Sequence, residues 1–208
     1  NGGCEAMTSR APGTVMTVAG LITADALGIT LMHEHLIADC TPYYAAPDDP
    51  GLAAVGAAPV GMSSLGLLRR NLFAVRDNLL LDDVSLATDE AAAFAGLGGG
   101  TIVDVTPPDI ARNPVALAEI ARRTGLNVIM GCGHYIHPVH PPGLAAEPAE
   151  SIAERLIAEI EGGVGETGIR PGIIGEIGTW DPLHPTEATV LRAAAIAQRA
   201  TGLAISVH

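Results

Sequence analysis

Short apolar runs rich in β-branched residues recur along the chain, with alanine-rich stretches between them. Each run is too short and too continuously apolar for a surface helix, and is typical of a strand buried on both faces. The five runs are ITLMH (residues 29–33), TIVDV (101–105), NVIMG (127–131), GIIGEI (172–177) and AISVH (204–208). Buried strands that alternate with helices favour a parallel sheet with helical crossovers.

The stretches between the runs carry helix boundaries. Asn113 and Pro114 predict an N-cap followed by the first helical position, and Gly125 ends the same helix just after two arginines. Further helices are predicted over residues 150–160 and 186–200, each ended by glycine. This order of elements fits either an open doubly wound sheet or a (β/α)8 barrel.

Length and local motifs favour the barrel. Five strands in 208 residues fit a (β/α)8 TIM barrel truncated after about its fifth strand, because a complete barrel takes roughly 250 residues. An open sheet would more often carry a glycine-rich phosphate loop after its first strand, and HEHLIADC (33–40) is no such loop. We therefore expect an α/β fold in which residues 1–19 form an N-terminal tail and the start of a hairpin, and residues 20–208 form a partial barrel.

Two segments depart from the alternation of strands and helices. Residues 15–28 are predicted to form a small hairpin that caps the bottom of the barrel. Residues 41–81 are rich in proline and glycine and turn helical near Ser64. We expect this second segment to be a long insertion over the top face of the barrel.

Charge and cysteine content exclude several classes of function. The net charge is −12, from 23 acidic and 11 basic residues spread along the chain, which argues against binding to nucleic acid or to an anionic membrane. No apolar run approaches the roughly 18 residues of a membrane span. Cys4, Cys40 and Cys132 form no CxxC pair, so a cytoplasmic location is expected. A small-molecule substrate is the expected partner, with a homodimer left open.

The first apolar run ends in two histidines. Side chains alternate between faces in a strand, so His33 and His35 point the same way and Glu34 points the other way. Two imidazoles on one face, at the carboxyl end of a strand, can act as metal ligands. Hydrogen-bonded core histidines explain an isolated HxH about equally well.

Two other runs also contain ligand-type residues near their carboxyl ends. Glu176 lies in a buried strand, where a carboxylate is costly unless it is paired or bound to a metal. His208 ends the last run. The alternatives are a carboxylate that caps a backbone turn and a histidine that is simply exposed at the chain end. In a barrel, ligands converge from the carboxyl ends of several strands, which strengthens the metal interpretation.

Taken together, the motifs of the chain resemble those of a known family. The motifs, in order, are HEHL, GGGTIVDVTPPDIARNP, GLNVIMGCGHYIHPVHPP, GIIGEIGT and ATGLAISVH. They are similar to the phosphotriesterase-related branch of the amidohydrolase superfamily, and the resemblance covers about residues 20–208. No single motif is specific, but the set is.

This resemblance implies two divalent metal ions as cofactors, with zinc the expected metal. It implies metal ligands at four positions: His33, His35, Glu176 and His208. In the family the first-strand pair binds one ion, the fourth-strand residue bridges both, and the fifth-strand histidine binds the second. True phosphotriesterases use a carboxylated lysine as the bridge, and this chain contains no lysine. It therefore resembles the subgroup with a bridging glutamate, which argues against efficient phosphotriester hydrolysis.

The function implied is a binuclear hydrolase that attacks an ester, lactone or amide with a hydroxide held between the cations. A sixth-strand histidine and an eighth-strand aspartate complete the family site, so the catalytic general base is expected beyond residue 208. The 208-residue chain alone is accordingly expected to be inactive. The alternatives are a phosphotriester hydrolase, a metal-dependent deoxyribonuclease-type relative, and a non-catalytic barrel fragment that acts as a binding module.

The loop GHYIHPVHPP, after the third run, contains three histidines and a tyrosine. The spacing of His134, His137 and His140 could suggest a metal cluster, but the intervening prolines favour an irregular loop with structural packing. The family uses this loop near the substrate, which implies a substrate contact for Tyr135. Asp104, within the second run, is expected to hydrogen bond to a strand end.

Overall fold

The computed structural model describes residues 13–208. The expected N-terminal tail, up to residue 12, and Cys4 lie outside the described residues. Among the described residues, no helix has the length and apolar character needed to cross a membrane.

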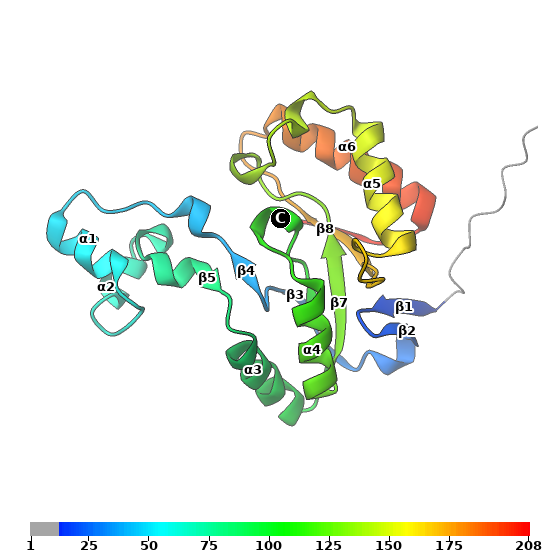
Figure 1. Cartoon of the computed structure of the whole chain (residues 1–208), viewed down its shortest axis with the longest axis horizontal. Coiled ribbons are helices and arrows are strands. Elements are labelled where there is room, and N and C mark those ends of the chain that lie inside the picture. The colour runs from blue at the N-terminus through cyan, green and yellow to red at the C-terminus, as the bar shows by residue number, and fades with distance from the viewer. Residues whose placement is uncertain (1–12) are drawn as a thin grey trace, which may run out of the picture.

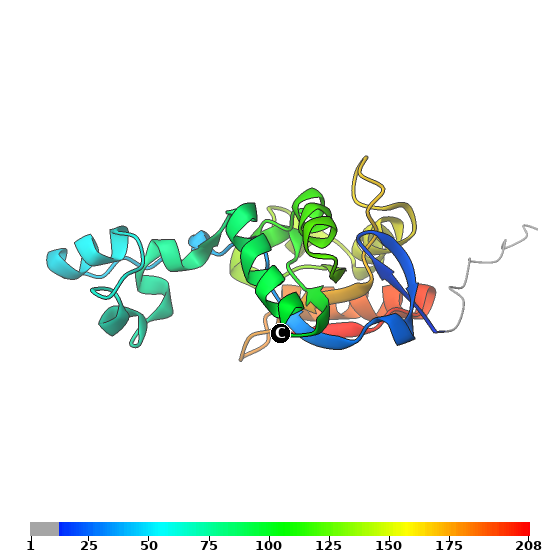
Figure 2. The same cartoon turned by 90° about the horizontal axis from the view of Figure 1, so that it is seen from below.

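The centre of the protein is a five-stranded parallel sheet whose strands follow one another in chain order. Its strands are β3 (Ile29–Glu34), β6 (Gly99–Asp104), β7 (Asn127–Cys132), β8 (Ile173–Ile177) and β9 (Ile205–Val207). All five predicted strands are confirmed, with ends that differ by at most two residues. Sequential order with right-handed crossovers places the connecting helices on one face, as in a barrel, whereas a doubly wound sheet reverses its order. The sheet is curled and open at β3 and β9, as Figure 1 and Figure 2 show.

Four helices cover the outer face of the sheet: α3 (Val84–Gly96), α4 (Pro114–Thr124), α5 (Ala149–Gly162) and α6 (Pro185–Thr201). The predicted boundaries of α4 are confirmed, because Asn113 accepts a hydrogen bond from the backbone N–H of Ala116 and Gly125 takes a left-handed φ of 75°. Helices α5 and α6 pack on each other and on β8 through a cluster of buried aliphatic residues. This packing fixes the strand from which Glu176 projects.

The hairpin expected within residues 15–28 is present as β1 (Thr14–Thr17) and β2 (Gly20–Thr23), an antiparallel pair. The backbone N–H of Val18 donates to the carbonyl of Val128, near the amino end of β7, at 2.8 Å. The hairpin therefore lies at the amino ends of the strands, opposite the edge where the sequence predicts the site.

The insertion between β3 and α3 is closed at its base by β4 (Ala38–Asp39) and β5 (Leu80–Leu81), which pair antiparallel. It contains α1 (Pro50–Ala57) and the short α2 (Leu65–Leu68). Both views show α1 and α2 projecting away from the sheet (Figure 1 and Figure 2), so the expected cover over the top face is wrong for these helices. The β4–β5 pair returns the chain at the side of the sheet, which directs the insertion outward.

Helix α1 was not expected, although the sequence carries its signal. Asp49 caps the helix by accepting a hydrogen bond from the backbone N–H of Leu52 at 2.9 Å, and Pro50 occupies the first helical position. An aspartate followed by a proline in a proline-rich segment is easily taken for a turn instead. The expected helix near Ser64 is the single turn of α2.

Candidate metal centre

Four predicted ligand residues meet at the carboxyl ends of β3, β8 and β9, and Glu176 lies at their centre. Nε2 of His33 is 2.8 Å and Nδ1 of His208 is 3.1 Å from Oε2 of Glu176. Nε2 of His35 is 3.3 Å from Oε1 of Glu176. The strands thus bring three imidazoles onto one carboxylate.

The alternation of side chains along β3 explains how this strand supplies two imidazoles. His33 and His35 both face Glu176. Glu34 and His35 both line a cavity of about 690 Å³ between β3, α3 and β5. The prediction that both histidines of the HEH sequence point the same way is confirmed by their shared contact with Glu176.

Two glycines permit the close approach of the strands that carry the acid. A Cβ at Gly131 of β7 would lie 1.9 Å from the carbonyl oxygen of Gly175 in β8. A Cβ at Gly175, whose φ is +130°, would lie 2.4 Å from the carbonyl oxygen of Ser206 in β9. Side chains at these positions would push β7, β8 and β9 apart, and with them Glu176 and His208.

The carboxyl group of Glu176 is fully buried, and its ion-pair partners among the described residues are all imidazoles. Burial raises the pKa of this carboxyl, although His33 opposes the shift through its charge and its hydrogen bond. Oε1 of Glu176 has no hydrogen-bond partner. A buried carboxylate with a free oxygen is costly for a purely structural role and suits a cation.

The donor set fits a divalent cation. One ligand atom each from His33, Glu176 and His208 can be chosen so that all lie within 4.8 Å of one another. Imidazole nitrogen and carboxylate oxygen are ligands of zinc and of neighbouring transition metals. Burial, followed by the charges of His33 and His208, lowers the pKa of His35 to about 4. His35 is therefore neutral near pH 7, which is the form that binds metals.

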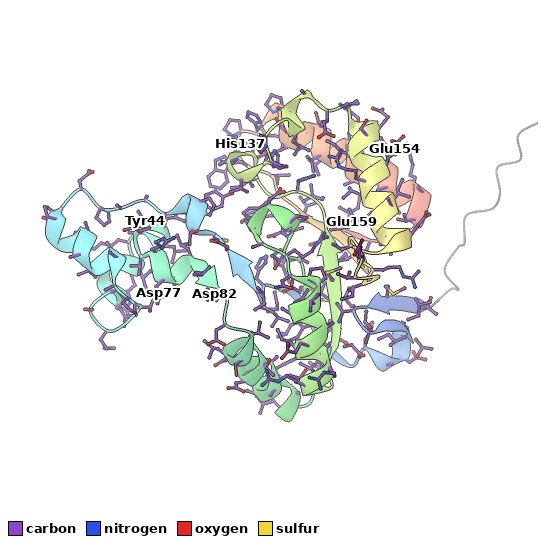
Figure 3. All side chains as sticks on the ribbon, viewed as in Figure 1. Tyr44, Asp77, Asp82, His137, Glu154 and Glu159 are labelled. Atoms are coloured by element: carbon purple, nitrogen blue, oxygen red, sulfur yellow. The ribbon has the colours of Figure 1, made fainter. Side chains whose placement is uncertain are left out.

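The histidines of the loop after β7 are engaged in the packing of that loop. Nδ1 of His134 lies 2.9 Å from Oδ1 of Asp109, and Nδ1 of His137 lies 3.2 Å from Oε1 of Glu187. Nε2 of His140 lies 2.6 Å from the carbonyl oxygen of Tyr135 in the same loop. These contacts agree with the structural interpretation of the loop, which Figure 3 shows with His137 labelled.

Tyr135 is half-buried beside the proposed ligands. Its hydroxyl lies 3.3 Å from Nε2 of His208, and its ring contacts the His208 ring edge-on at 4.9 Å between centroids. The ring of Tyr43, from the base of the insertion, meets Tyr135 at 6.2 Å, and the buried hydroxyl of Tyr43 has no hydrogen-bond partner. The sequence analysis missed Tyr43, whose signal was its place in the loop that follows the HEH strand.

Two buried acids that accept hydrogen bonds from the surrounding loops were also not predicted from the sequence. Asp109 accepts a hydrogen bond from the backbone N–H of Tyr135 at 2.9 Å. Glu187, on α6, accepts hydrogen bonds at 3.0 Å from the backbone N–H groups of His137, Trp180 and His184. In the sequence Glu187 looks like an ordinary first-turn helix acid, so only its position three residues after His184 could have suggested this role.

Asp104 hydrogen bonds to a strand end, as the sequence predicted. Its carboxylate accepts hydrogen bonds from the backbone N–H of Leu36, just beyond β3, at 2.7 Å, and of Thr106 at 3.1 Å. Burial raises the pKa of both Cys40 and Cys132, which disfavours the reactive thiolate.

The sequence matches the model of the phosphotriesterase family over residues 13–208. It is 37% identical over 203 residues to a protein named N-acetyltaurine hydrolase from Danio rerio, covering 96% of this chain and 57% of that relative. A phosphotriesterase-related protein from Nematostella vectensis is 37% identical over 199 residues, covering 94% of this chain and 57% of its own length. The chain thus spans little more than half the length of these relatives.

Solved structures of proteins similar in sequence superpose on this chain. A resiniferatoxin-binding protein from Rhodobacter sphaeroides superposes with a TM-score of 0.91 at 42% identity, over 94% of this chain and 55% of that one. A variant of a lactonase from Deinococcus radiodurans, described as phosphotriesterase-like, superposes with a TM-score of 0.69 at 31% identity, over 94% and 54%. The curled parallel sheet and its helices therefore match part of the fold of these proteins.

Proposed function

Because the chain belongs to the phosphotriesterase family, we propose that it forms the metal-binding part of a divalent-metal-dependent hydrolase. The proposed ligands are the four residues gathered at the carboxyl ends of β3, β8 and β9: His33, His35, Glu176 and His208. The observation that carries the proposal is the convergence of three imidazoles on one fully buried carboxylate. The metals are proposed to be two, with zinc the expected one.

Each proposed ligand has a distinct role. His33 and His35 would hold one cation and His208 the other, while Glu176 would bridge them. The absence of lysine from the chain leaves Glu176 as the bridging group in place of a carboxylated lysine. Divalent cations bound there supply Lewis-acid polarisation of the substrate and a water nucleophile near neutral pH. Tyr135, beside His208, would contact the substrate from the loop after β7.

The substrate is proposed to be a small ester, lactone or amide. This rests on relatives that are named as an N-acetyltaurine hydrolase and as a lactonase. The chain spans 57% of the first of these, so catalysis is proposed for the whole enzyme and not for these 208 residues by themselves. The general base is proposed to come from the part of the enzyme that lies outside this chain.

A second candidate is a non-catalytic binding protein. It is favoured by the superposition, at a TM-score of 0.91, on a protein named for binding resiniferatoxin. The buried, unpaired Tyr43 hydroxyl next to Tyr135 could hold a polar group of such a ligand. The two candidates differ in whether a bound small molecule is cleaved.

A chimera separates the candidates. This chain would replace the matching 57% of the Danio rerio N-acetyltaurine hydrolase, with the parent enzyme as control. The panel would contain N-acyl amino sulfonates, lactones, carboxyl esters and aryl phosphotriesters. We expect zinc-dependent hydrolysis of at least one panel member, lost on Glu176→Gln. A folded, zinc-loaded chimera that cleaves none of them would favour the binding protein.

A further inference from the structure

We infer that Thr106 is a positioning residue that fixes the tautomer of His35, so that its Nε2 lone pair faces Glu176. This inference rests on the proposed function, because it assigns a partner to a proposed metal ligand. Neutral imidazole carries one N–H, on either ring nitrogen. Only the nitrogen without the proton can bind a metal, and a hydrogen bond at the other nitrogen selects the tautomer.

The geometry places the Thr106 hydroxyl at the far side of the His35 ring. Oγ1 of Thr106 lies 2.9 Å from Nδ1 of His35, and Thr106 is fully buried. The backbone N–H of Val105 donates to the carbonyl of Glu34 at 3.0 Å, which continues the pairing of β6 with β3 up to these residues. The strand pairing therefore holds the two side chains side by side.

The direction of the hydrogen bond follows from Asp104. The fully buried carboxyl of Asp104 faces Thr106, because its Oδ1 accepts from the backbone N–H of Thr106 at 3.1 Å and its Oδ2 accepts from the backbone N–H of Leu36 at 2.7 Å. The Thr106 side chain, as a hydrogen-bond donor, lowers the pKa of this carboxyl against the effect of burial. An ionised carboxylate can only accept, so the single hydroxyl proton of Thr106 points to Asp104. Oγ1 of Thr106 must then accept from His35, which places the imidazole proton on Nδ1.

The competing arrangement puts the His35 proton on Nε2, directed at Glu176. Nε2 of His35 lies 3.3 Å from Oε1 of Glu176, which is within ion-pair distance. Oε1 nevertheless has no hydrogen-bond partner, so the angles at this contact do not suit a hydrogen bond. The 2.9 Å contact with Thr106 is the one that can hold the proton.

Nitrogen-15 NMR of the histidine side chains in the metal-free 208-residue chain tests this assignment directly. Long-range nitrogen–proton correlations distinguish a protonated Nδ1 from a protonated Nε2, and the His35→Gln spectrum identifies the signals of His35. We expect the Nδ1–H tautomer in the unaltered protein and in Thr106→Ser, which keeps the hydroxyl. Thr106→Val, which keeps the shape but removes the hydroxyl, should lose this preference.

Zinc affinity gives a second readout that requires no catalysis. Loss of a hydrogen-bond partner of a metal ligand typically weakens metal binding about 10- to 100-fold. We expect a loss of this size for Thr106→Val and near-normal affinity for Thr106→Ser. Thr101→Val is the matched control, because Thr101 is fully buried in β6, the strand that leads to Thr106, but its hydroxyl donates to the carbonyl of Leu27 instead.

The outcomes separate this inference from the proposed function. A His35 with its proton on Nε2 in the unaltered protein would overturn the inference, even if Thr106→Val fails to fold. Equal zinc affinity in the unaltered protein, Thr106→Val and Thr101→Val would also overturn it while leaving the metal site intact. A chain that binds no zinc but has the Nδ1–H tautomer would contradict the proposed function alone.

Discussion

Oε2 of Glu176 lies 2.8 Å from Nε2 of His33, although β8 and β3 are separated in the sheet by β6 and β7. Strands this far apart in a flat sheet would be roughly 14 Å from each other, at about 4.8 Å per strand. The contact is possible because the sheet curls, which directs the side chains from its carboxyl edge into one space. The curvature of the sheet therefore brings the residues of the site together.

Replacing Glu176 should weaken metal binding without destabilising the fold. Glu176→Gln keeps the size of the side chain but removes the charge that would bridge the cations. Loss of a residue that only hydrogen bonds to a metal ligand typically costs about 10- to 100-fold in metal affinity. Loss of a ligand itself should therefore weaken zinc binding more than about 100-fold. The metal-free variant should be at least as stable as the unaltered chain, because the substitution removes a buried charged group whose Oε1 has no hydrogen-bond partner.

Competition of the protein with a chromophoric chelator would measure this loss, and urea unfolding in EDTA would measure the stability. Glu34→Gln is the matched control, because Glu34 lies between the two histidines at the end of β3 but makes no ion pair with a proposed ligand. Equal zinc affinity in the two variants would show that Glu176 is a structural carboxylate.

Glu187 should contribute more to stability than any exposed first-turn acid. It is fully buried, and it joins the loops after β7 and β8 to the start of α6 by hydrogen bonds to three backbone N–H groups. Glu187→Ala leaves these donors without a partner, so we expect a loss of about 2–4 kcal/mol in the free energy of unfolding. The exposed Glu150, in the first turn of α5, is the control and should cost less than about 1 kcal/mol.

Urea unfolding at pH 7 measures both variants. Burial opposes the charge of Glu187, but hydrogen bonds from His137, His184 and Trp180 hold the pKa of its carboxyl below its usual range. A group with a lowered pKa stabilises the fold above its unfolded pKa, and this contribution is lost as the pH falls. The difference between unaltered and Glu187→Ala chains should therefore shrink in acid, and a difference that grows would contradict this role.

Asp104 should give the opposite pH dependence. Burial raises the pKa of its carboxyl to about 6, against hydrogen bonds from Leu36 and Thr106 that lower it. The folded state then holds this proton more tightly than the unfolded state, so stability is highest below the unfolded pKa and is lost as the pH rises to about 6. The loss amounts to at most about 3 kcal/mol, since one pKa unit corresponds to about 1.4 kcal/mol.

The measurement compares unfolding free energies of the unaltered chain and of Asp104→Asn in EDTA between pH 4 and pH 7, a range chosen to span the shift. The unaltered chain should lose stability relative to the variant as the pH rises. Parallel pH profiles for the two proteins would show that Asp104 does not carry the raised pKa.

The strands and the four proposed ligand positions could be predicted because each depends on local sequence. A buried parallel strand must be apolar along its whole length, and a polar residue near its carboxyl end therefore stands out, as Glu176 and His208 do. The HEH pattern adds the two-residue period that puts His33 and His35 on one face. Family resemblance then indicated which of these residues meet.

The missed features depend on contacts between distant segments. Glu187 and Asp109 accept hydrogen bonds from backbone groups in other loops, and nothing in their own neighbourhoods marks them as buried. Thr106 gains its role from His35, 71 residues away. The outward course of α1 is set by the β4–β5 pair, whose two-residue strands are too short to give a periodic signal.

Anomalous diffraction from crystals of the zinc-loaded 208-residue chain, recorded on both sides of the zinc absorption edge, tests the central claim most directly. The account predicts zinc within about 2.0–2.2 Å of Glu176 oxygen and of imidazole nitrogens from His33, His35 or His208. An anomalous peak elsewhere, or zinc held by residues other than these with the four side chains unliganded, would contradict it.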